Sequence, residues 1–245
     1  VDGKKPMSYR QYCRCYSEWA DSKQLTFHIQ RYPGVNLELD YAGKQLYLHN
    51  RRNPEETTKV TIFIAALTYS DYFYAEGMTE CDIRNWIRVN NNALAYFGGV
   101  TPTITPDNCK VAVARNKDWV SPVLNKDFQA WAEHNNTVLT PAKVKSPRWK
   151  PVVEGHVKIV TMHILMDMED MVFYSLDDLN RVLMEKVDVE NRKSFEGLTY
   201  SRYDLFATEE KETLLPLPTN RFEYLERKTV KVAQDFSFTF DKVHY

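Results

Sequence analysis

Three acidic residues stand at sequence positions where a carboxylate could do chemistry, and the first is Asp40. It lies near the end of the stretch 35–41, in which apolar and polar residues alternate strictly, and this period-two pattern predicts a β-strand. Aspartate is a poor strand former, and a buried carboxylate is costly unless a positive charge meets it. A bound metal ion would account for Asp40 at this place. The alternative is an aspartate at a sheet edge in water.

The second acid, Asp107, follows a short strand that is predicted within 100–108 and stops at Pro106. Carboxylates at the strand ends of α/β sheets commonly line the functional crevice. The alternative is that Asp107 and Asn108 form a turn or cap the next helix. Taken alone, the position of Asp107 favours the turn or cap.

The third acid, Glu154, lies in a long helix that is predicted to begin at Pro151, because a first helical turn tolerates proline. It falls beside the apolar stripe of this helix, about 100° around from Val153. Lys150 and Lys158 stand four residues to either side, on the face of Glu154. Glu154 is therefore part of a solvent-exposed Glu–Lys ladder, or a carboxylate at the margin of the core with cations placed for a polyanion.

The segment 141–151, just before Glu154, is basic and contains no acid. Its prolines and its serine predict a loop. This loop is either a solvated linker or a flexible arm that binds phosphates. Its cations are Lys143, Lys145, Arg148 and Lys150.

A predicted sheet must position the acids. The strand at 35–41 and a second alternating run at 44–50 are predicted to form a hairpin across an Ala42–Gly43 turn. The run 60–67 is apolar on both faces, which predicts a central, covered strand. The tyrosine-rich segment 68–78 follows; its rings either pack against neighbouring strands or stack on nucleic-acid bases.

Predicted helices alternate with these strands. The clearest helix covers 79–97, with a capping-box spacing between Thr79 and Asp82 and an end at Gly98. Other helices are predicted at 8–20 and 124–135, from 151, and from a second capping-box spacing at Ser175. Other strands are predicted at 137–140, 227–233 and 236–241.

Composition limits the classes of protein. A chain of 245 residues with 43% hydrophobic residues can form one large domain and an appendage. No window approaches the roughly 18 apolar residues of a membrane helix, and the start lacks a signal-peptide pattern. Four cysteines without a CxxC pair indicate neither a zinc site nor a disulfide framework, which fits a reducing cytoplasm. A net charge of −1 argues against a chain coated in nucleic acid but permits a local basic patch.

The residues that flank the three acids resemble one family. The segments LDYAG, FGGVTPTITPDNCKVAV and PRWKPVVEG surround Asp40, Asp107 and Glu154. Together with LTYSDYFYAEG, SLDDLN and LPLPTNRFEY they closely resemble the signatures of IstA-type insertion-sequence transposases, which belong to the DDE transposase and retroviral integrase superfamily. The resemblance runs from about Met7 to the end of the chain.

This resemblance implies an α/β fold: an RNase H-like mixed sheet flanked by helices, followed by the start of a small β-barrel. It implies four regions. Residues 1–31 would end a linker from an N-terminal DNA-binding region, 32–172 would be the catalytic core, 173–220 a helical extension and linker, and 221–245 a partial β-barrel domain.

The resemblance also implies an activity. Asp40, Asp107 and Glu154 would be the catalytic residues of a DNA transposase and would hold two Mg²⁺ ions, for which Mn²⁺ could substitute. Asp40 would bridge both ions, and each of the other two acids would hold one. Cleavage at transposon ends would expose a 3′-hydroxyl that then attacks target DNA, and Asn108 would orient a water. Phosphates would be held by Lys143, Lys145, Arg148, Lys150 and Lys158.

Two positions depart from the family pattern. The family usually has lysine where Val152 stands and often has an acid where Trp149 stands, whereas Lys150 matches. These changes concern DNA contacts more than chemistry. His156, two residues beyond Glu154, is expected to point to another helix face, as a structural or DNA-facing residue and not as a metal ligand.

The implied partners are double-stranded DNA, both transposon ends and target, further copies of the chain in a synaptic multimer, and an AAA+ helper ATPase. No membrane partner is expected, and the location would be the bacterial cytoplasm. Two other functions fit the same residues. One is a non-catalytic integrase-fold module for DNA binding or assembly. The other is a plain RNase H-like nuclease that hydrolyses DNA without joining it.

Overall fold

The computed structural model describes residues 7–22, 30–53, 55–106, 113–115, 123–141, 151–226, 230, 232, 234–240 and 243–245. The chain forms two compact units, residues 1–31 and 32–245. The first unit contains α1 (Tyr9–Ser22), which confirms the helix predicted at 8–20. The ring of Tyr16 lies between those of Tyr12 and Trp19, with centroids 6.1 and 5.9 Å away.

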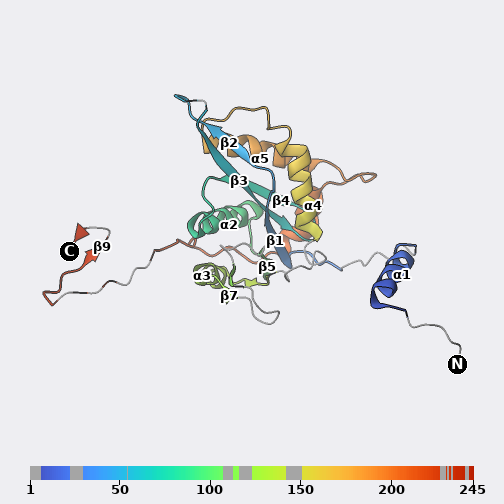
Figure 1. The fold of residues 1–245 in the computed structure, drawn as a ribbon, viewed down its shortest axis with the longest axis horizontal. Coiled ribbons are helices and arrows are strands. Elements are labelled where there is room, and N and C mark those ends of the chain that lie inside the picture. The colour runs from blue at the N-terminus through green and yellow to red at the C-terminus, as the bar shows by residue number, and fades with distance from the viewer. Residues whose placement is uncertain are drawn as a thin grey trace. The chain divides into compact units, whose positions relative to one another are not determined.

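The second unit is built on a six-stranded mixed sheet with the order β2-β3-β1-β5-β8 and with β4 also paired to β3 (Figure 1). β1 is antiparallel to β3 and parallel to β5, and β5 is parallel to β8. The strands are β1 (Asn36–Tyr41), β2 (Leu46–His49), β3 (Thr57–Leu67), β4 (Phe73–Met78), β5 (Thr103–Thr105) and β8 (Val138–Leu139). The strands predicted at 35–41, 60–67 and 137–140 are confirmed.

The predicted hairpin between 35–41 and 44–50 is wrong. β2 does not pair with β1, because both strands lie along β3, where Tyr41 pairs with Phe63 and Leu46 with Val60. Ala42 N still donates to Ile62 O at 2.8 Å, so the chain continues past Ala42 along the same partner. Residues 42–45 are thus an irregularity between two collinear strands, and the reversal occurs between β2 and β3.

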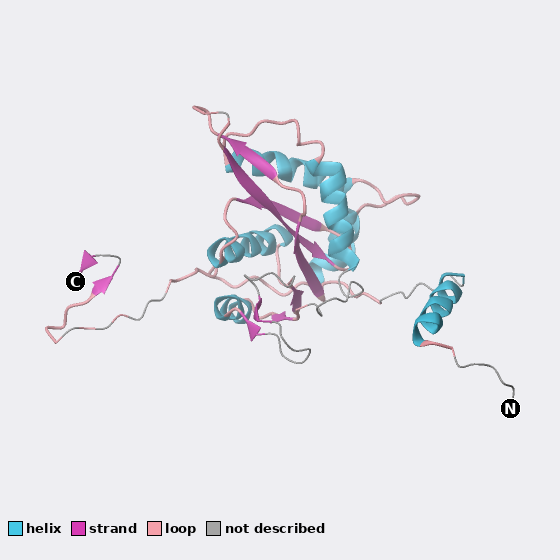
Figure 2. Cartoon of the chain, viewed as in Figure 1, coloured by secondary structure: helices cyan, strands magenta, loops and turns pink. Residues whose placement is uncertain are grey.

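Helices cover both faces of the sheet (Figure 2). α2 packs on the face that carries Leu37 and Leu39, and α4 and α5 pack on the face that carries Ile62 and Ile64. β3 contributes to both cores, as its apolar residues predicted. The helices of this unit are α2 (Ile83–Phe97), α3 (Lys126–His134), α4 (Pro151–Ile159), the π-helix η2 (Val160–Leu165), α5 (Leu176–Arg192), α6 (Arg202–Leu205), the π-helix η3 (Phe206–Glu210) and the 3₁₀-helix η4 (Lys211–Thr213).

Four α-helices of the second unit, α2, α3, α5 and α6, begin after a residue whose side chain caps the helix. The Asp82 side chain accepts from Asn85 N, so α2 begins after Asp82 and not at Thr79 as the predicted capping box placed it. Ser175 caps α5, as predicted, by accepting from Asp178 N. Gly98 ends α2 in the left-handed conformation with φ 73°, as the sequence predicted.

Residues 215–226, here called the C-terminal strap, lie along α2 and α3. Leu215 forms an antiparallel bridge with Val100. Asn91 Nδ2 donates to Phe222 O at 2.9 Å, and His134 Nε2 lies 2.8 Å from Asn220 O. The end of the region expected to be a helical extension and linker, residues 215–220, therefore contacts the core.

Among the described residues, two short hairpins lie outside the main sheet. β6 (Val113–Arg115) pairs with β7 (Val123–Leu124), and β9 (Thr239–Phe240) pairs with β10 (Val243–His244). β9 falls in the strand predicted at 236–241, whereas 227–229, 231 and 233 lie outside the described residues. No helix in the described ranges is both long enough and apolar enough to span a bilayer.

Glu210 connects the C-terminal helices to the sheet. Its side chain is fully buried, and its two carboxylate oxygens accept from Gly34 N at 2.9 Å and Ser70 N at 3.1 Å. Burial raises the pKa of the Glu210 carboxyl above its ordinary value, although the bonds from Ser70 and Gly34 oppose that shift. Glu210 thus fixes η3 against the start of β1 and the turn after β3.

Gly34 is a position that only glycine fits. Its φ is +68°, and a Cβ there would lie 2.2 Å from Thr213 Oγ1. Gly34→Ala should lower the free energy of unfolding by about 1–3 kcal/mol, the usual cost of such backbone strain, as measured by urea denaturation. The matched control is Gly43→Ala, because nothing lies within 4 Å of a Cβ at Gly43. An equal loss in both variants would contradict the prediction.

The buried Glu210 predicts a pH dependence of stability. Because the folded carboxyl has a raised pKa, it keeps its proton at a pH where the unfolded chain has released it. The stability that Glu210 contributes is therefore complete below the unfolded pKa of 4.5 and is lost as the pH rises through the folded pKa. The free energy of unfolding of the wild type minus that of Glu210→Gln should fall over this range. A constant or rising difference in urea titrations would refute the assignment.

Candidate active site

Asp40 lies on the face of the sheet that α4 covers. Side chains alternate along a strand, so Asp40 shares a face with Glu38, whereas Leu39 points into the core under α2. Its strand partner Ile64 belongs to the core under α4 and α5. Asp40 is half-buried, and its Oδ1 accepts from Tyr41 N at 2.7 Å.

The start of α4 is held against this face by Glu38. Glu38 Oε2 accepts from Val153 N at 2.9 Å, and Glu38 is only 4% exposed. Val153 is itself fully buried in the core under α4. Glu154 is the next residue of the helix, so its backbone lies beside the residue that binds Glu38. The side chain of Glu154 is outside the described part of the chain.

β5 brings the chain toward Asp107 next to β1. The two strands are parallel, and Thr105, the last residue of β5, pairs with Glu38. Pro106 is buried and is the last described residue of this segment. Asp107 and Asn108 follow it in the sequence and lie outside the described residues, so their predicted roles stay predictions.

The predicted phosphate contacts are described only in part. Lys158 is an exposed residue of α4, as a phosphate contact requires. Trp149, which departs from the family pattern, and the cations of the predicted arm lie outside the described residues; these cations are Lys143, Lys145, Arg148 and Lys150.

His156 is a structural residue. It is 3% exposed, its Nε2 lies 2.8 Å from Asp71 O, and its ring centroid is 5.0 Å from that of Phe73. The reason is helical geometry: two residues turn the side chain about 200° from Glu154. The structural expectation is confirmed, and the DNA-facing alternative is wrong.

The tyrosine-rich segment is also structural. Tyr72 and Tyr74 are buried, and the ring of Tyr72 stacks on Phe206 with centroids 4.4 Å apart. Tyr74 donates to Glu76 Oε2 at 2.6 Å, and burial, more than the Glu76 charge, raises the pKa of Tyr74. The packing interpretation of these two rings is confirmed, and stacking on bases is not available to them.

Glu38, Glu76 and Glu210 are buried carboxylates that sequence reasoning missed. Glu76 pairs with Arg88 and accepts from Asn92 Nδ2 at 2.8 Å, so its charge is compensated on the α2 face. Strict alternation places Glu38 on the same face as Asp40, so the sequence indicates that the two residues are neighbours. The sequence does not indicate that Glu38 is buried, because a glutamate in an alternating strand is usually solvent-facing.

Carboxylate oxygens are the donors that Mg²⁺ prefers, and the half-buried Asp40 suits such an ion. Among the described side chains, no three from His, Cys, Asp and Glu stand close enough to hold a metal ion. Asp107 and the side chain of Glu154 are outside that set. Of the candidate metal site, the structure therefore describes Asp40 and the backbone of α4 at Glu154.

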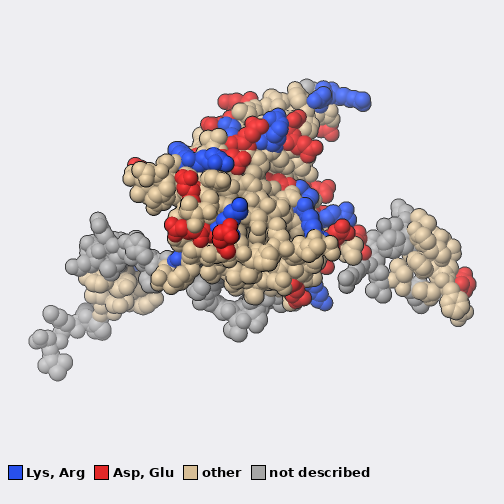
Figure 3. Space-filling model, turned by 180° about the vertical axis from the view of Figure 1, so that it is seen from behind, with Lys and Arg blue, Asp and Glu red and all other residues tan. Residues whose placement is uncertain are grey.

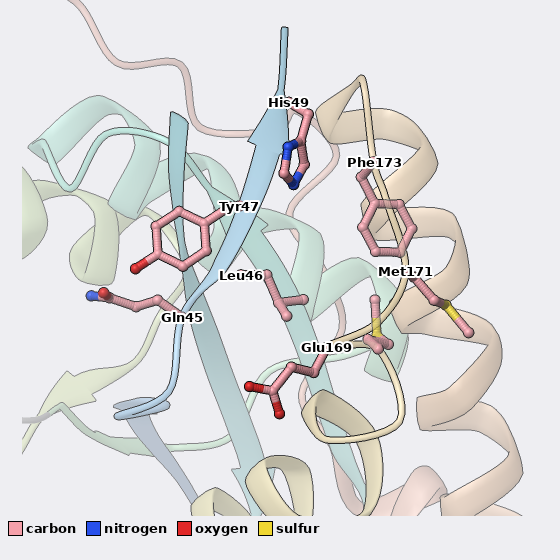
Figure 4. A pocket seen from close by; sticks show the side chains of 8 residues that line it. Gln45, Leu46, Tyr47, His49, Glu169, Met171 and Phe173 are labelled. Carbon is pink, nitrogen blue, oxygen red and sulfur yellow. The ribbon is translucent and has the colours of Figure 1, made fainter. Parts of the chain in front are cut away.

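A small hollow lies elsewhere, between β2 and the segment after η2 (Figure 4). Its volume of about 100 Å³ is well below the roughly 300–1,000 Å³ of small-molecule sites. It is lined by Gln45, Leu46, Tyr47, His49, Met168, Glu169, Met171 and Phe173. Neither Asp40 nor a residue of α4 lines it, so this hollow does not belong to the candidate site.

The charged side chains of the described chain are mixed in sign. The face shown in Figure 3 carries Lys and Arg beside Asp and Glu on its upper part and flanks, and much of its lower middle carries neither. Arg181, for example, contacts Glu185 at 3.0 Å on α5. On this face the charges do not outline a binding surface.

The fold is that of retroviral integrase catalytic cores, which are RNase H-like. The integrase catalytic core domain of HTLV-2, solved in complex with magnesium, has a TM-score of 0.50 and 12% identity over 73% of this chain and 99% of that chain. A chain of the simian T-cell lymphotropic virus intasome, solved with a PP2A regulatory subunit, has a TM-score of 0.55 and 16% identity over 83% of this chain and 64% of that chain. The predicted fold class is confirmed.

Transposases are similar in sequence. A candidate transposase of Sinorhizobium fredii is 32% identical over 234 residues, and one for insertion sequence IS408 of Burkholderia multivorans is 30% identical over 234 residues. Each match covers 96% of this chain and 45% of the relative. The chain thus spans about half the length of the curated relatives it matches. No protein-family model matches the chain.

His156→Ala should lower the free energy of unfolding by about 2–4 kcal/mol, because it leaves a cavity against Phe73 and removes the bond to Asp71 O. Affinity of the folded variant for duplex DNA should not change. Lys158→Ala is the matched control on the same helix, and its stability should stay within about 0.5 kcal/mol of the wild type. Urea denaturation and fluorescence anisotropy measure the two quantities. Lower DNA affinity in stably folded His156→Ala would contradict the structural role.

Proposed function

We propose that this chain is the catalytic region of an IstA-type DNA transposase, which cuts phosphodiester bonds at transposon ends and joins the 3′-hydroxyl to target DNA. The observation that carries the proposal is the hydrogen bond between β1 and the start of α4. It joins Glu38, two residues before Asp40, to Val153, the residue before Glu154. The integrase-core fold and the similarity to transposases of insertion sequences support it.

On this proposal Asp40, Asp107 and Glu154 converge and hold two Mg²⁺ ions, with Mn²⁺ able to substitute. The carboxylate oxygens of Asp40, Asp107 and Glu154 would be the protein ligands of these ions. Three neighbouring carboxylates repel one another, so they require cations. Bound there, the ions would stabilise the attacking and leaving oxygens of a displacement at phosphorus. The magnesium complex of the HTLV-2 core is consistent with this choice of ion.

The chain's own residues place the DNA. Lys158 is exposed on the helix that carries Glu154 and can bind a phosphate one turn away from the acid. The cations of the predicted arm would continue that contact along the backbone of the duplex; they are Lys143, Lys145, Arg148 and Lys150. Asn108 would hold a water next to Asp107.

The proposal extends to assembly. Two transposon ends need at least two active sites, which requires a synaptic multimer, and target choice is assigned to an AAA+ helper ATPase. Residues 32–172 would be the catalytic core and 173–220 its extension. Residues 1–31 would be the end of a linker from an N-terminal DNA-binding region, and residues 221–245 would be a partial β-barrel domain.

A strand-transfer assay tests the function. A labelled duplex from the DNA that flanks the coding sequence is incubated with the protein, Mg²⁺ or Mn²⁺, and a plasmid target, and gels resolve cut from joined product. Joined product supports the transposase. Cut product without joining indicates the plain nuclease, and binding without either product indicates the non-catalytic module.

Asp40→Asn, Asp107→Asn and Glu154→Gln should each reduce cutting and joining to background, because each removes a metal-binding charge while keeping the side-chain shape. The control is Asp127→Asn, which removes an exposed carboxylate in the first turn of α3 and should keep full activity. Circular dichroism and DNA affinity should match the wild type in all four variants. A triad variant that still joins DNA would remove its residue from the mechanism.

A further inference from the structure

α4 begins in a different way from the other α-helices of this unit. The residue before each of four other helices accepts a backbone N–H with its own side chain: Asp82, Asn125, Ser175 and Ser201. The residue before α4 is Lys150, whose side chain has donors but no acceptor. Pro151, the first residue of α4, has no N–H to satisfy.

A residue of the sheet performs this role for α4. Glu38 Oε2 accepts from Val153 N at 2.9 Å, and Val153 is the third residue of the helix. That is the N–H that a local capping side chain would bind. A carboxylate is also favoured there by the positive end of the helix dipole. The first turn of α4 is therefore capped by a residue of β1 and not by the residue that precedes the helix.

The position of Glu38 connects this cap to the candidate site. It is two residues from Asp40 on the same face of β1, and its partner Val153 directly precedes Glu154. Because Glu38 is 4% exposed, water does not readily replace it as the acceptor. A shift of α4 along or around its axis would move Glu154 relative to Asp40 and would break this hydrogen bond.

We propose that Glu38 is a positioning residue: by capping α4 from β1 it sets the place of Glu154 opposite Asp40 and so determines metal affinity. This inference rests on the proposed function, since it takes both acids as metal ligands. Glu38 does not itself need to touch metal or DNA. Groups that orient metal ligands from outside typically change metal affinity by about 10- to 100-fold when mutated.

The test compares two buried carboxylates that accept backbone N–H bonds. Glu38→Met removes the acceptor and keeps the volume, and Glu38→Gln keeps an acceptor without the charge. Glu210→Met is the matched control, because Glu210 is fully buried and accepts from Gly34 and Ser70 at the other end of β1. The readouts are amide hydrogen exchange of the metal-free protein and Mn²⁺ affinity by electron paramagnetic resonance.

Glu38→Met should speed exchange of the amides in the first turn of α4 and weaken Mn²⁺ binding by about 10- to 100-fold. Glu38→Gln should restore both properties to near the wild-type values. Glu210→Met should lower stability but keep wild-type Mn²⁺ affinity. If Glu38→Met does not fold, Glu38→Asp keeps the charge but shortens the side chain that reaches Val153 N, and it should weaken Mn²⁺ binding in the same direction.

Equal Mn²⁺ affinities of wild type and Glu38→Met, or failure of Glu38→Gln to restore binding, would overturn the positioning role while the proposed function stands. Wild-type protein that neither binds Mn²⁺ nor cuts DNA would overturn the proposed function, and the inference with it. The two failures are distinguishable, because only the second affects the wild type.

Discussion

The register of β1 is the constraint on which the candidate site depends. β1 is hydrogen-bonded on both edges, antiparallel to β3 and parallel to β5, so it cannot slide without breaking two ladders. A slip by one residue would exchange its faces, turning Leu37 and Leu39 out of the core and Asp40 into it. Burying one leucine is worth about 1.5–3 kcal/mol, so the apolar face of β1 holds its acidic face toward α4.

The acidic face in turn determines where α4 can lie. Burial of Glu38 without a donor would cost several kcal/mol, whereas a hydrogen bond to a charged group contributes about 1.5–3 kcal/mol. The N–H of Val153 has no acceptor within α4, because helix starts lack internal acceptors, and it donates to Glu38 instead. Displacing either the strand or the helix alone would break this hydrogen bond. Fold stability and the placement of Glu154 depend on the same contact.

Sequence reasoning succeeded where one element determines its own pattern. Alternation predicted β1, apolar character on both faces predicted the central position of β3, and a three-to-four spacing predicted α2 and α4. Sequence reasoning failed where the placement of a segment depends on which other segment packs against it. Ala42–Gly43 has the composition of a turn, and only the pairing of Ala42 with Ile62 shows that β2 continues along β3. Glu38 stands where the alternation of β1 predicts a solvent-facing side chain, but the packing of α4 over this face buries it.

The features of the candidate site also divide into those that a local sequence pattern predicts and those that depend on distant pairing. Asp40, the α4 backbone at Glu154 and the inward orientation of His156 follow from strand and helix periods. The approach of β5 to β1, which brings the chain toward Asp107, follows from parallel pairing between segments more than 60 residues apart, and no local signal contains it. Family resemblance supplied the grouping of the three acids, because a chain with 33 acidic residues offers too many combinations for spacing to choose among.

A half-buried carboxylate near the surface suits a polymer substrate better than an enclosed pocket does. Asp40 is half-buried beside the first turn of a helix, and a duplex can reach such a site from the side, which an enclosed cavity would prevent. Water and a 3′-hydroxyl are both small nucleophiles that attack the same kind of phosphodiester, so one set of carboxylates can serve cutting and joining. On the proposed function, the difference between a transposase and a nuclease then lies in how long the cut end is held. That is a property of DNA-binding surfaces and of assembly, and the relatives, of whose length this chain spans 45%, have further sequence in which to encode it.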